Sequence, residues 1–255
     1  MQAVIPVAGQ GSRLSAVTAG QPKALLTVGT MTLVEHALTR ALELGSTELL
    51  LVVRDPVVEA HLGSRFADHP LTYVRQSSAT GLGAAMRCAA DQLRDPHFLL
   101  ICGDIWCSQP LSSEVREAFR SGTEMLDLVT ARALDQGLPA DAQGCSTRAQ
   151  GCSTHAQGCS AGIHVDQGGL ITQVDDPPAL QAVQVETGIY RFPQEVLRAP
   201  VTRAENGEES LQSMTRWLID QGWPCRAVSS PGPWINVNTP AHLTLARELA
   251  ARAEA

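Results

Sequence analysis

The sequence predicts an α/β fold of the Rossmann-like type, in which a mixed but mostly parallel sheet is flanked by helices. Two observations lead to this prediction. Short apolar runs alternate with helical patterns through the first half of the chain, and the first apolar run leads directly into a glycine-rich turn. Such alternation indicates βαβ units, whose parallel strands are covered by helices on both faces.

The predicted elements of the first half follow each other as strand and helix. Strands are expected at 3–8, 49–53, 71–74 and 98–102, with helices between them near 31–45, 56–68 and 81–94. Gly45 is expected to end the first helix, and Pro56 suits the first turn of the second. Ligands on such sheets bind at the carboxyl ends of the strands. The two segments that directly follow strands, 9–13 and 103–104, are therefore expected at the same edge of the sheet.

The second half of the chain has a different pattern. Strands are expected at 126–131, 162–165, 170–174 and 183–192, with turn residues between them, and helices at about 207–221 and 240–254. This pattern predicts an antiparallel or mixed part of the sheet, which would form the acceptor half of a site. A length of 255 residues suits one domain over residues 1–255.

An internal repeat interrupts this second half at 142–162. The cysteines Cys145, Cys152 and Cys159 recur seven residues apart within it. This spacing is poor for zinc, which usually takes a Cys-x2–4-Cys pair, and the glycine in every unit disfavours a coiled coil. We interpret the repeat as a surface loop, with a metal or redox role and a contact arm for a second subunit as alternatives.

Composition excludes several classes of protein. The net charge of −7 disfavours a nucleic-acid-binding surface or an anionic membrane partner. No run approaches about 18 apolar residues, so no membrane span is expected. No leader segment is recognised at the N-terminus, and the seven cysteines lack the spacing of a disulfide framework. Cys88, Cys102 and Cys107 are expected in or beside the core as reduced thiols, which suits a cytoplasmic protein.

The strongest local signal is the single lysine of the chain, Lys23. It lies ten residues after Arg13, which ends the glycine-rich turn Gly9-Gln10-Gly11-Ser12-Arg13. Glycines allow backbone N–H groups to approach anionic oxygens, and two cations can neutralise a polyphosphate. A dinucleotide-binding turn would need a third glycine where Leu14 stands, and the Gly-Lys-Ser/Thr of a Walker loop is absent. The segment predicts a phosphate site, with Lys23 on an exposed loop where it adds little stability.

Five motifs follow one another along the chain. They are the turn at 7–14 with Pro22-Lys23, Gln76-x4-Gly81, Gly103-Asp104, Glu186-Thr187-Gly188-Ile189-Tyr190, and Trp234-Ile235-Asn236-Val237-Asn238-Thr239-Pro240. This ordered series resembles one family, the sugar-1-phosphate nucleotidyltransferases or NDP-sugar pyrophosphorylases, such as glucose-1-phosphate thymidylyl- and uridylyltransferases. The resemblance covers about residues 2–245, apart from the repeat. The family has the fold of nucleotide-diphospho-sugar transferases.

The resemblance implies a reaction and a set of site residues. An NTP would transfer its NMP to a sugar 1-phosphate and release pyrophosphate, in chemistry that depends on positioning and charge neutralisation. Arg13, Lys23 and Asp104 would be catalytic, and Asp104 with Asn236 would hold Mg²⁺. The nucleotide would be bound by Ala8, Gly9, Gly11, Ser12, Gln76, Gly81 and Gly103, and the acceptor by Asp175, Glu186 and Gly188.

Three departures from the family pattern leave alternatives open. Asn236 stands where the family has a second metal carboxylate, and Asn238 is the other candidate for that role, although either asparagine could instead cap the last helix. Asp175-Asp176-Pro177 replaces Glu-Lys-Pro, and Glu186 replaces an asparagine. These acids would repel an anionic acceptor and suit a cationic one. A cytidylyltransferase acting on an amino-alcohol phosphate such as phosphocholine, and a nucleotide-binding module without turnover, are therefore the alternatives. The base, the acceptor and the oligomeric state stay open.

Overall fold

The computed structural model describes residues 1–9, 11–77, 80–131, 161–175, 184–204, 207–230 and 233–253, and within these ranges it leaves out the side chains of Ser12 and Ala131. Most of the repeat at 142–162, and Asp176 with Pro177, lie outside the described residues. The interpretation of the repeat as a surface loop therefore stays a prediction.

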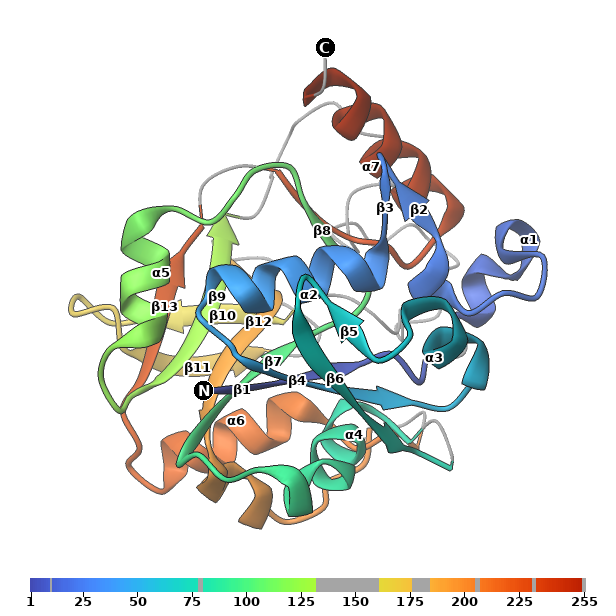
Figure 1. The fold of residues 1–255 in the computed structure, drawn as a ribbon. Helices are drawn as coiled ribbons and strands as arrows, with labels where there is room; N and C mark the ends of the chain where they lie inside the picture. Colours follow the sequence, from blue (N-terminus) through green and yellow to red (C-terminus); the bar gives the residue numbers. More distant parts are fainter. Residues whose placement is uncertain are drawn as a thin grey trace.

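A central sheet runs through the molecule (Figure 1), and its main path has the order β11-β10-β12-β7-β1-β4-β6-β5. Its strands are β1 Gln2–Pro6, β4 Glu48–Val53, β5 Arg65–Phe66, β6 His69–Arg75, β7 His97–Ile101, β10 Gly162–Val165, β11 Ile171–Asp175 and β12 Gln184–Pro193. β1 pairs in parallel with β4 and β7, and β4 pairs in parallel with β6. β12 runs antiparallel to β7, and β10 antiparallel to β11 and β12. The prediction of a mostly parallel first half and an antiparallel or mixed second half is confirmed.

Helices cover both faces of this sheet, as predicted. The helices of the described residues are α1 Ser15–Thr18, α2 Leu33–Glu43, α3 Pro56–Leu62, α4 Leu82–Cys88, α5 Ser113–Arg120, α6 Leu211–Asp220 and α7 Pro240–Ala253. Buried residues of α2, α3 and α5 pack with one side of the strands, and those of α4 and α6 with the other. α7 packs on a smaller third cluster, which includes Val28, Trp106 and Ile235. No helix in the described part of the chain is long and apolar enough to cross a membrane.

Capping residues explain where several helices begin. Thr32 caps α2, and Glu35 completes a capping box, so the helix begins at Leu33 rather than at 31. The two residues before it form the short strand β3, Met31–Thr32, which pairs with β2, Thr27–Val28. Asp55 caps α3, and Pro56 occupies its first turn as predicted.

Some predicted boundaries were wrong. The helix expected over 56–68 ends at Leu62, because Gly63 has a φ of 68° and the chain then forms β5, which pairs with β6. The helix expected over 81–94 stops at Cys88 and continues as a 3₁₀ turn over Ala90–Gln92. The helix expected from 207 begins at Leu211, where Ser210 is the cap.

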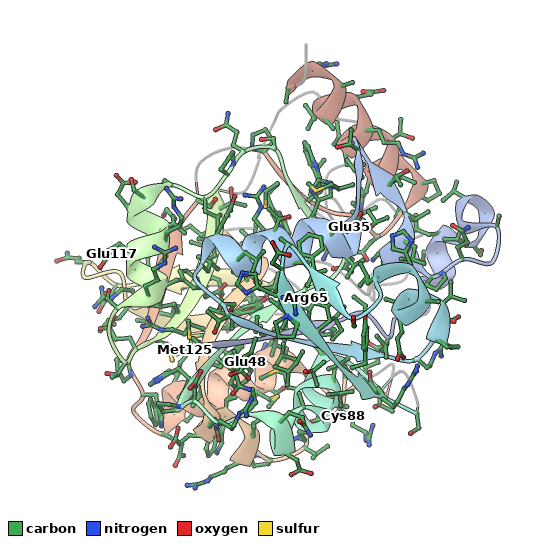
Figure 2. All side chains as sticks on the ribbon, viewed as in Figure 1. Glu35, Glu48, Arg65, Cys88, Glu117 and Met125 are labelled. Carbon is green, nitrogen blue, oxygen red and sulfur yellow. The ribbon has the colours of Figure 1, made fainter. Side chains whose placement is uncertain are left out.

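Several elements of the structure were not predicted from the sequence. α5 and strand β13, Cys225–Ser229, were not predicted, and neither was the pairing of β8, Ile105–Cys107, with β14, Trp234–Asn236. β13 joins β9, Met125–Ala131, in parallel, and β9 pairs with β12. Cys88 was expected in or beside the core. It is the last residue of α4 (Figure 2), and its side chain is exposed to water there.

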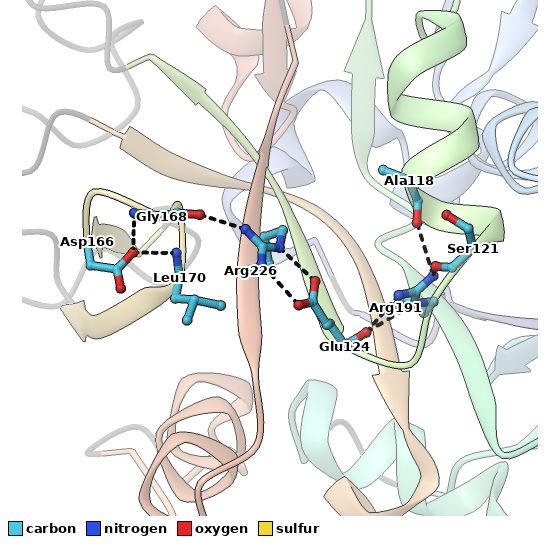
Figure 3. Close-up of polar contacts among 8 residues, drawn as sticks. All are labelled: Ala118, Ser121, Glu124, Asp166, Gly168, Leu170, Arg191 and Arg226. Carbon is cyan, nitrogen blue, oxygen red and sulfur yellow. Dashed lines mark hydrogen bonds and ion pairs between the residues drawn. The ribbon is translucent and has the colours of Figure 1, made fainter.

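An arginine in β12 links the end of α5 to the sheet by hydrogen bonds (Figure 3). Arg191 is 2% exposed, and its guanidinium donates to the backbone carbonyls of Ala118, Phe119, Ser121 and Glu124 at the end of α5 and the start of β9. Burial lowers the pKa of Arg191, although the charge of Glu124 opposes this effect. The carbonyl groups at a helix C-terminus carry partial negative charge, so this cation stabilises them.

The same network continues through a second arginine, Arg226, to the hairpin formed by β10 and β11. Arg226 in β13 forms an ion pair with Glu124 at 2.6 Å and donates to the carbonyl oxygen of Gly168 at 2.6 Å. The Asp166 carboxylate accepts from the backbone amides of Gly168 and Leu170 in the turn between β10 and β11. The antiparallel half of the sheet is therefore held by polar contacts as well as by its core.

Candidate active site

A cavity of about 430 Å³ opens at the carboxyl ends of β1 and β7. Its lining comes from segments that lie far apart in the sequence. They include Ala8, Gly9, Gly11, Arg13, Lys23, Gln76, Gly81, Gly103, Asp104, Glu208, Asn236 and Asn238. The structure therefore brings together the predicted phosphate turn, the single lysine, the predicted nucleotide-binding residues Gln76 and Gly81, and the predicted metal-binding turn.

The phosphate turn is positioned by the end of β1. The amide of Val7 donates to the carbonyl oxygen of Val52 at 2.9 Å, which extends the pairing of β1 and β4 to the start of the turn. Gly11 has a φ of 59°, and a Cβ on it would lie 2.9 Å from the Cβ of Lys23. A side chain at 11 would therefore strain the backbone and also collide with Lys23. Ser12 begins the 3₁₀ turn Ser12–Leu14, but its side chain is outside the described atoms.

Gly103 permits the other side of the cavity to form. A Cβ on Gly103 would lie 2.4 Å from the Cγ1 of Val7 and 2.8 Å from the carbonyl oxygen of Pro6. No other residue fits this approach of the ends of β1 and β7. The Gly103-Asp104 turn is thus held against the phosphate turn, and Asp104 enters the cavity.

Lys23 lies inside the cavity rather than on an exposed loop, so that part of the prediction was wrong. It begins the 3₁₀ turn Lys23–Leu25, and its side chain is 11% exposed. Its Nζ donates to Oδ2 of Asp104 at 2.7 Å and to Oδ1 of Asn238 at 2.5 Å. An ammonium that loses water on burial is stabilised by such oxygen partners.

Asn236 and Asn238 both line the cavity beside Asp104. β14 pairs with β8, and the amide of Val237 donates to the carbonyl oxygen of Asp104 at 2.9 Å. Asn238 is engaged with Lys23, whereas Oδ1 of Asn236 is buried and accepts no hydrogen bond from any described residue. Thr239 caps α7 by accepting from the amide of His242 at 3.2 Å. Helix capping therefore does not explain the two asparagines.

The donor set beside Asp104 fits a hard divalent cation. One carboxylate and an amide oxygen without a partner are oxygen ligands of the kind that Mg²⁺ prefers, with the remaining positions left to water and phosphate. Among the described residues, no group of three or more His, Cys, Asp or Glu side chains could hold a metal. A zinc-type site is thus not formed in this part of the chain.

The lining of the cavity also includes Gln76 and Gly81. Gln76 is 5% exposed. Its backbone amide donates to the carbonyl oxygen of Val53 at 2.9 Å, and its side-chain Nε2 donates to Oγ1 of Thr80 at 3.4 Å. The backbone amide of Glu209 donates to the carbonyl oxygen of Thr80 at 2.6 Å, so the chain before α6 lies on this loop. Glu208 reaches the cavity in this way. Glu208 was not predicted as a site residue, because it lies far from Gln76 in the sequence and belongs to no motif that includes Gln76.

The three predicted acceptor residues do not line this cavity. Asp175 ends β11, where its carboxylate pairs with Nε2 of His164 at 2.6 Å and accepts from Gln173 at 2.6 Å. Burial alone would raise the pKa of Asp175, but the hydrogen bonds from Gln173 and His164 hold it below its ordinary value. Gly188 packs behind the cavity wall, since a Cβ on it would lie 3.1 Å from the Cβ of Cys102. The acceptor assignments stay predictions.

Glu186 belongs to a buried acidic pair behind the same wall. It is 2% exposed, and its Oε2 accepts from Gln212 at 3.0 Å and from the amide of Ala161 at 3.3 Å. Asp127 of β9 is fully buried, and neither of its carboxylate oxygens has a hydrogen-bond partner among the described residues. Burial, followed by the charge of Glu186, raises the pKa of Asp127 well above its ordinary value. Asp127 was not singled out in the sequence, where it stands within an apolar strand.

A family model for the MobA-like NTP transferase domain matches residues 3–165. The chain belongs to this family. The match spans the phosphate turn, Lys23, Gln76 and Asp104, so these cavity residues all lie within the matched segment of this NTP transferase domain.

Relatives extend the similarity over most of the chain. The UTP–glucose-1-phosphate uridylyltransferase AglF of Haloferax volcanii is 24% identical over 244 residues, which cover 94% of this chain and 92% of that relative. The glucose-1-phosphate thymidylyltransferase of Streptomyces griseus is 24% identical over 241 residues, covering 92% of this chain and 61% of the relative. These homologues confirm the predicted resemblance to sugar-1-phosphate nucleotidyltransferases.

A solved structure confirms the fold class of this NTP transferase. The inositol-1-phosphate CTP transferase from T. maritima superposes with a TM-score of 0.77 at 18% identity, covering 99% of this chain and 96% of that chain. At this identity the similarity concerns the fold. It extends past the family match, so β12, β14 and α7 also have counterparts in a known nucleotidyltransferase architecture.

Proposed function

We propose that this NTP transferase transfers a nucleoside monophosphate from an NTP to a sugar 1-phosphate and releases pyrophosphate in a Mg²⁺-dependent reaction. The observation that carries the proposal is the cavity itself. Within one space of about 430 Å³ it brings together a glycine turn, the cations Arg13 and Lys23, the Asp104 carboxylate and the buried amide of Gln76. These groups suit the triphosphate, the α-phosphorus and the base of one nucleotide.

The chain's own residues bind and polarise the triphosphate. Backbone amides of the turn at Gly11 approach the β- and γ-phosphates, because no side chain at this position keeps them away. Arg13 lines the cavity and makes no hydrogen bond or ion pair with any described residue, so its guanidinium is available for the leaving pyrophosphate. An oxygen of the acceptor phosphate forms a bond to the α-phosphorus, while the bond from that phosphorus to the bridging oxygen breaks.

Lys23, Asp104 and Asn236 act at the α-phosphate. Lys23 places its ammonium where negative charge develops on the non-bridging oxygens, in a site shielded from water. Asp104 and Asn236 would hold Mg²⁺, which neutralises phosphate charge when bound. Gln76 offers both a donor and an acceptor to the edge of a base.

A second candidate acceptor is an amino-alcohol phosphate. The buried acid Glu186 lies behind the cavity wall, and Asp175 stands where the family resemblance places an acid followed by a lysine. Negative charge in this region favours an acceptor with an ammonium group. The fold similarity to an enzyme that uses inositol 1-phosphate and CTP is compatible with an acceptor other than glucose 1-phosphate.

A pyrophosphate-release screen tests the proposal. The four ribonucleoside triphosphates and dTTP are combined with glucose 1-phosphate, N-acetylglucosamine 1-phosphate, phosphocholine and inositol 1-phosphate, each with Mg²⁺. We expect release that requires both a triphosphate and one acceptor and that is lost in Lys23→Ala. Release with phosphocholine but no sugar phosphate would favour the second candidate. Saturable nucleotide binding without release in any combination would contradict both and identify a binding module.

A further inference from the structure

The single lysine of the chain is already the counter-ion of the residue proposed to bind the metal. Nζ of Lys23 lies 2.7 Å from Oδ2 of Asp104 and 2.5 Å from Oδ1 of Asn238. The Asp104 side chain is 30% exposed, and that of Lys23 is 11% exposed. The ammonium therefore occupies one oxygen of Asp104, the carboxylate of the proposed metal site.

We propose that Lys23 and the divalent cation compete for Asp104, so that a metal alone binds weakly and the nucleotide must draw Lys23 away for the metal to bind well. This inference rests on the proposed function in one respect, the binding of a metal–nucleotide complex in this cavity. It adds a coupling between lysine and metal that the reaction itself does not require.

Electrostatics explains the competition. A cation on Asp104 would lie within a few ångströms of the Lys23 ammonium, and two like charges at this distance repel each other strongly in a shielded site. The repulsion ends when the ammonium finds another anionic partner. In this cavity the described residues offer Lys23 only Asp104 and the neutral oxygen of Asn238, so the new partner has to be a phosphate of the ligand.

The phosphate turn lies where Lys23 can reach it. A Cβ on Gly11 would be 2.9 Å from the Cβ of Lys23 and 3.6 Å from its Cγ and Cδ, so the stem of the lysine passes directly over Gly11. Rotation about the four-carbon stem can move the ammonium from Asp104 toward anions bound at the turn without movement of the backbone. Because binding couplings are reciprocal, the nucleotide should tighten the metal by the same factor as the metal tightens the nucleotide.

Mn²⁺ binding measured by electron paramagnetic resonance tests the inference without turnover. Free Mn²⁺ is titrated against wild type, Lys23→Gln and Lys23→Arg, with and without an α,β-methylene NTP and with no acceptor present. We expect Lys23→Gln to bind Mn²⁺ without nucleotide about 10-fold more tightly than wild type, within the usual range of couplings between sites, and to gain less from the nucleotide. Lys23→Arg keeps the charge and should bind Mn²⁺ as weakly as wild type.

Two further variants separate this coupling from general charge effects. Arg13→Gln removes a cation that does not contact Asp104, so it should change Mn²⁺ affinity much less than Lys23→Gln does. Asp104→Asn should abolish the tight site in every background, and circular dichroism verifies that each variant is folded. Equal Mn²⁺ affinity in wild type and Lys23→Gln, or an equal gain in Arg13→Gln, would overturn the inference. Coupling without pyrophosphate release would preserve it and contradict only the proposed reaction.

Discussion

Two buried cations in this molecule have opposite surroundings. Arg191 is surrounded by backbone carbonyls at the end of α5, which use its donors within the scaffold (Figure 3). Lys23 has a carboxylate and an amide oxygen as its partners, inside an open cavity. The carbonyls cannot leave Arg191 unless the helix end moves, whereas phosphate oxygens can replace the partners of Lys23. The difference separates a cation that stabilises the fold from one that is available for chemistry.

The largest expected effect is that of Lys23→Ala on turnover. Loss of a preorganised donor to developing charge typically costs about 3–5 kcal/mol, so kcat should fall by about two to four orders of magnitude. Because Lys23 is buried and paired with Asp104, we also expect about 1 kcal/mol of lost stability, which the sequence alone did not predict. Pyrophosphate release and urea unfolding measure the two quantities. Activity above about a tenth of wild type would remove Lys23 from the catalytic group.

Arg191→Met should show the reverse pattern. The substitution leaves several carbonyls at the end of α5 without donors, so the free energy of unfolding should fall by about 3 kcal/mol. The KM for nucleotide in the protein that remains folded should not change, since Arg191 does not line the cavity. Unfolding curves and steady-state kinetics at low temperature test this contrast. A selective loss of turnover with normal stability would contradict the assignment of Arg191 to the scaffold.

Asn236→Asp tests whether residue 236 is a metal ligand. The amide oxygen of Asn236 is buried without a partner among the described residues, so a carboxylate there would be stabilised by a bound cation. We expect the Mg²⁺ concentration for half-maximal activity to fall about 10-fold, as a second anionic ligand increases affinity. Asp104→Asn is the opposing control, because it removes the carboxylate of the proposed metal site and should weaken Mg²⁺ binding. An unchanged Mg²⁺ curve for Asn236→Asp would exclude Asn236 as a ligand.

Asp127→Asn should stabilise the protein at neutral pH. The carboxyl ionises near pH 4 in the unfolded chain, whereas burial and then the charge of Glu186 raise its pKa in the fold. The stability present below about pH 4 is therefore lost as the pH rises toward the folded pKa. The amide avoids this loss, so we expect a gain of at least about 1 kcal/mol at pH 8 that shrinks toward pH 4. Urea unfolding at several pH values tests it, and a gain independent of pH would contradict it.

The smallest effect is expected at the exposed end of the scaffold network. Arg226 and Glu124 form an ion pair whose side chains are 37% and 33% exposed. The hydrogen bond from Arg226 is the main reason that the pKa of Glu124 is lowered. Such pairs contribute about 0–1 kcal/mol, so Arg226→Met should lower stability by less than about 1 kcal/mol, and less still in 1 M salt. A loss comparable to that of Arg191→Met would show that exposure does not separate the two arginines.

Local patterns made much of the fold and the nucleotide half of the site predictable. The strand at Gln2–Pro6 and the turn after it follow from an apolar run and two glycines, and this turn meets Asp104 because the parallel strands before them end at one edge. The burial of Lys23 depends on its partners Asp104 and Asn238, which stand 81 and 215 residues later in the chain. No local signal contains that information.

The missed features depend on contacts between distant segments. β13 is a short run with two polar residues, and it becomes a strand because β9 offers a free edge. Glu208 enters the cavity because the segment before α6 pairs with Thr80. Asp127 has the sequence context of an apolar strand, and only the fold places Glu186 beside it. Asp175, a predicted acceptor residue, is followed in the sequence by residues outside the described ranges.

The position of the one lysine has a practical consequence for chemistry on this protein. Every amine that a side chain can offer to an acylating reagent is located inside the nucleotide cavity, since Lys23 is the only lysine. Apart from the N-terminal amine of Met1, a reagent added before and after nucleotide would thus report on one nitrogen, Nζ of Lys23. The natural sequence already contains the reporter that other enzymes need to have engineered.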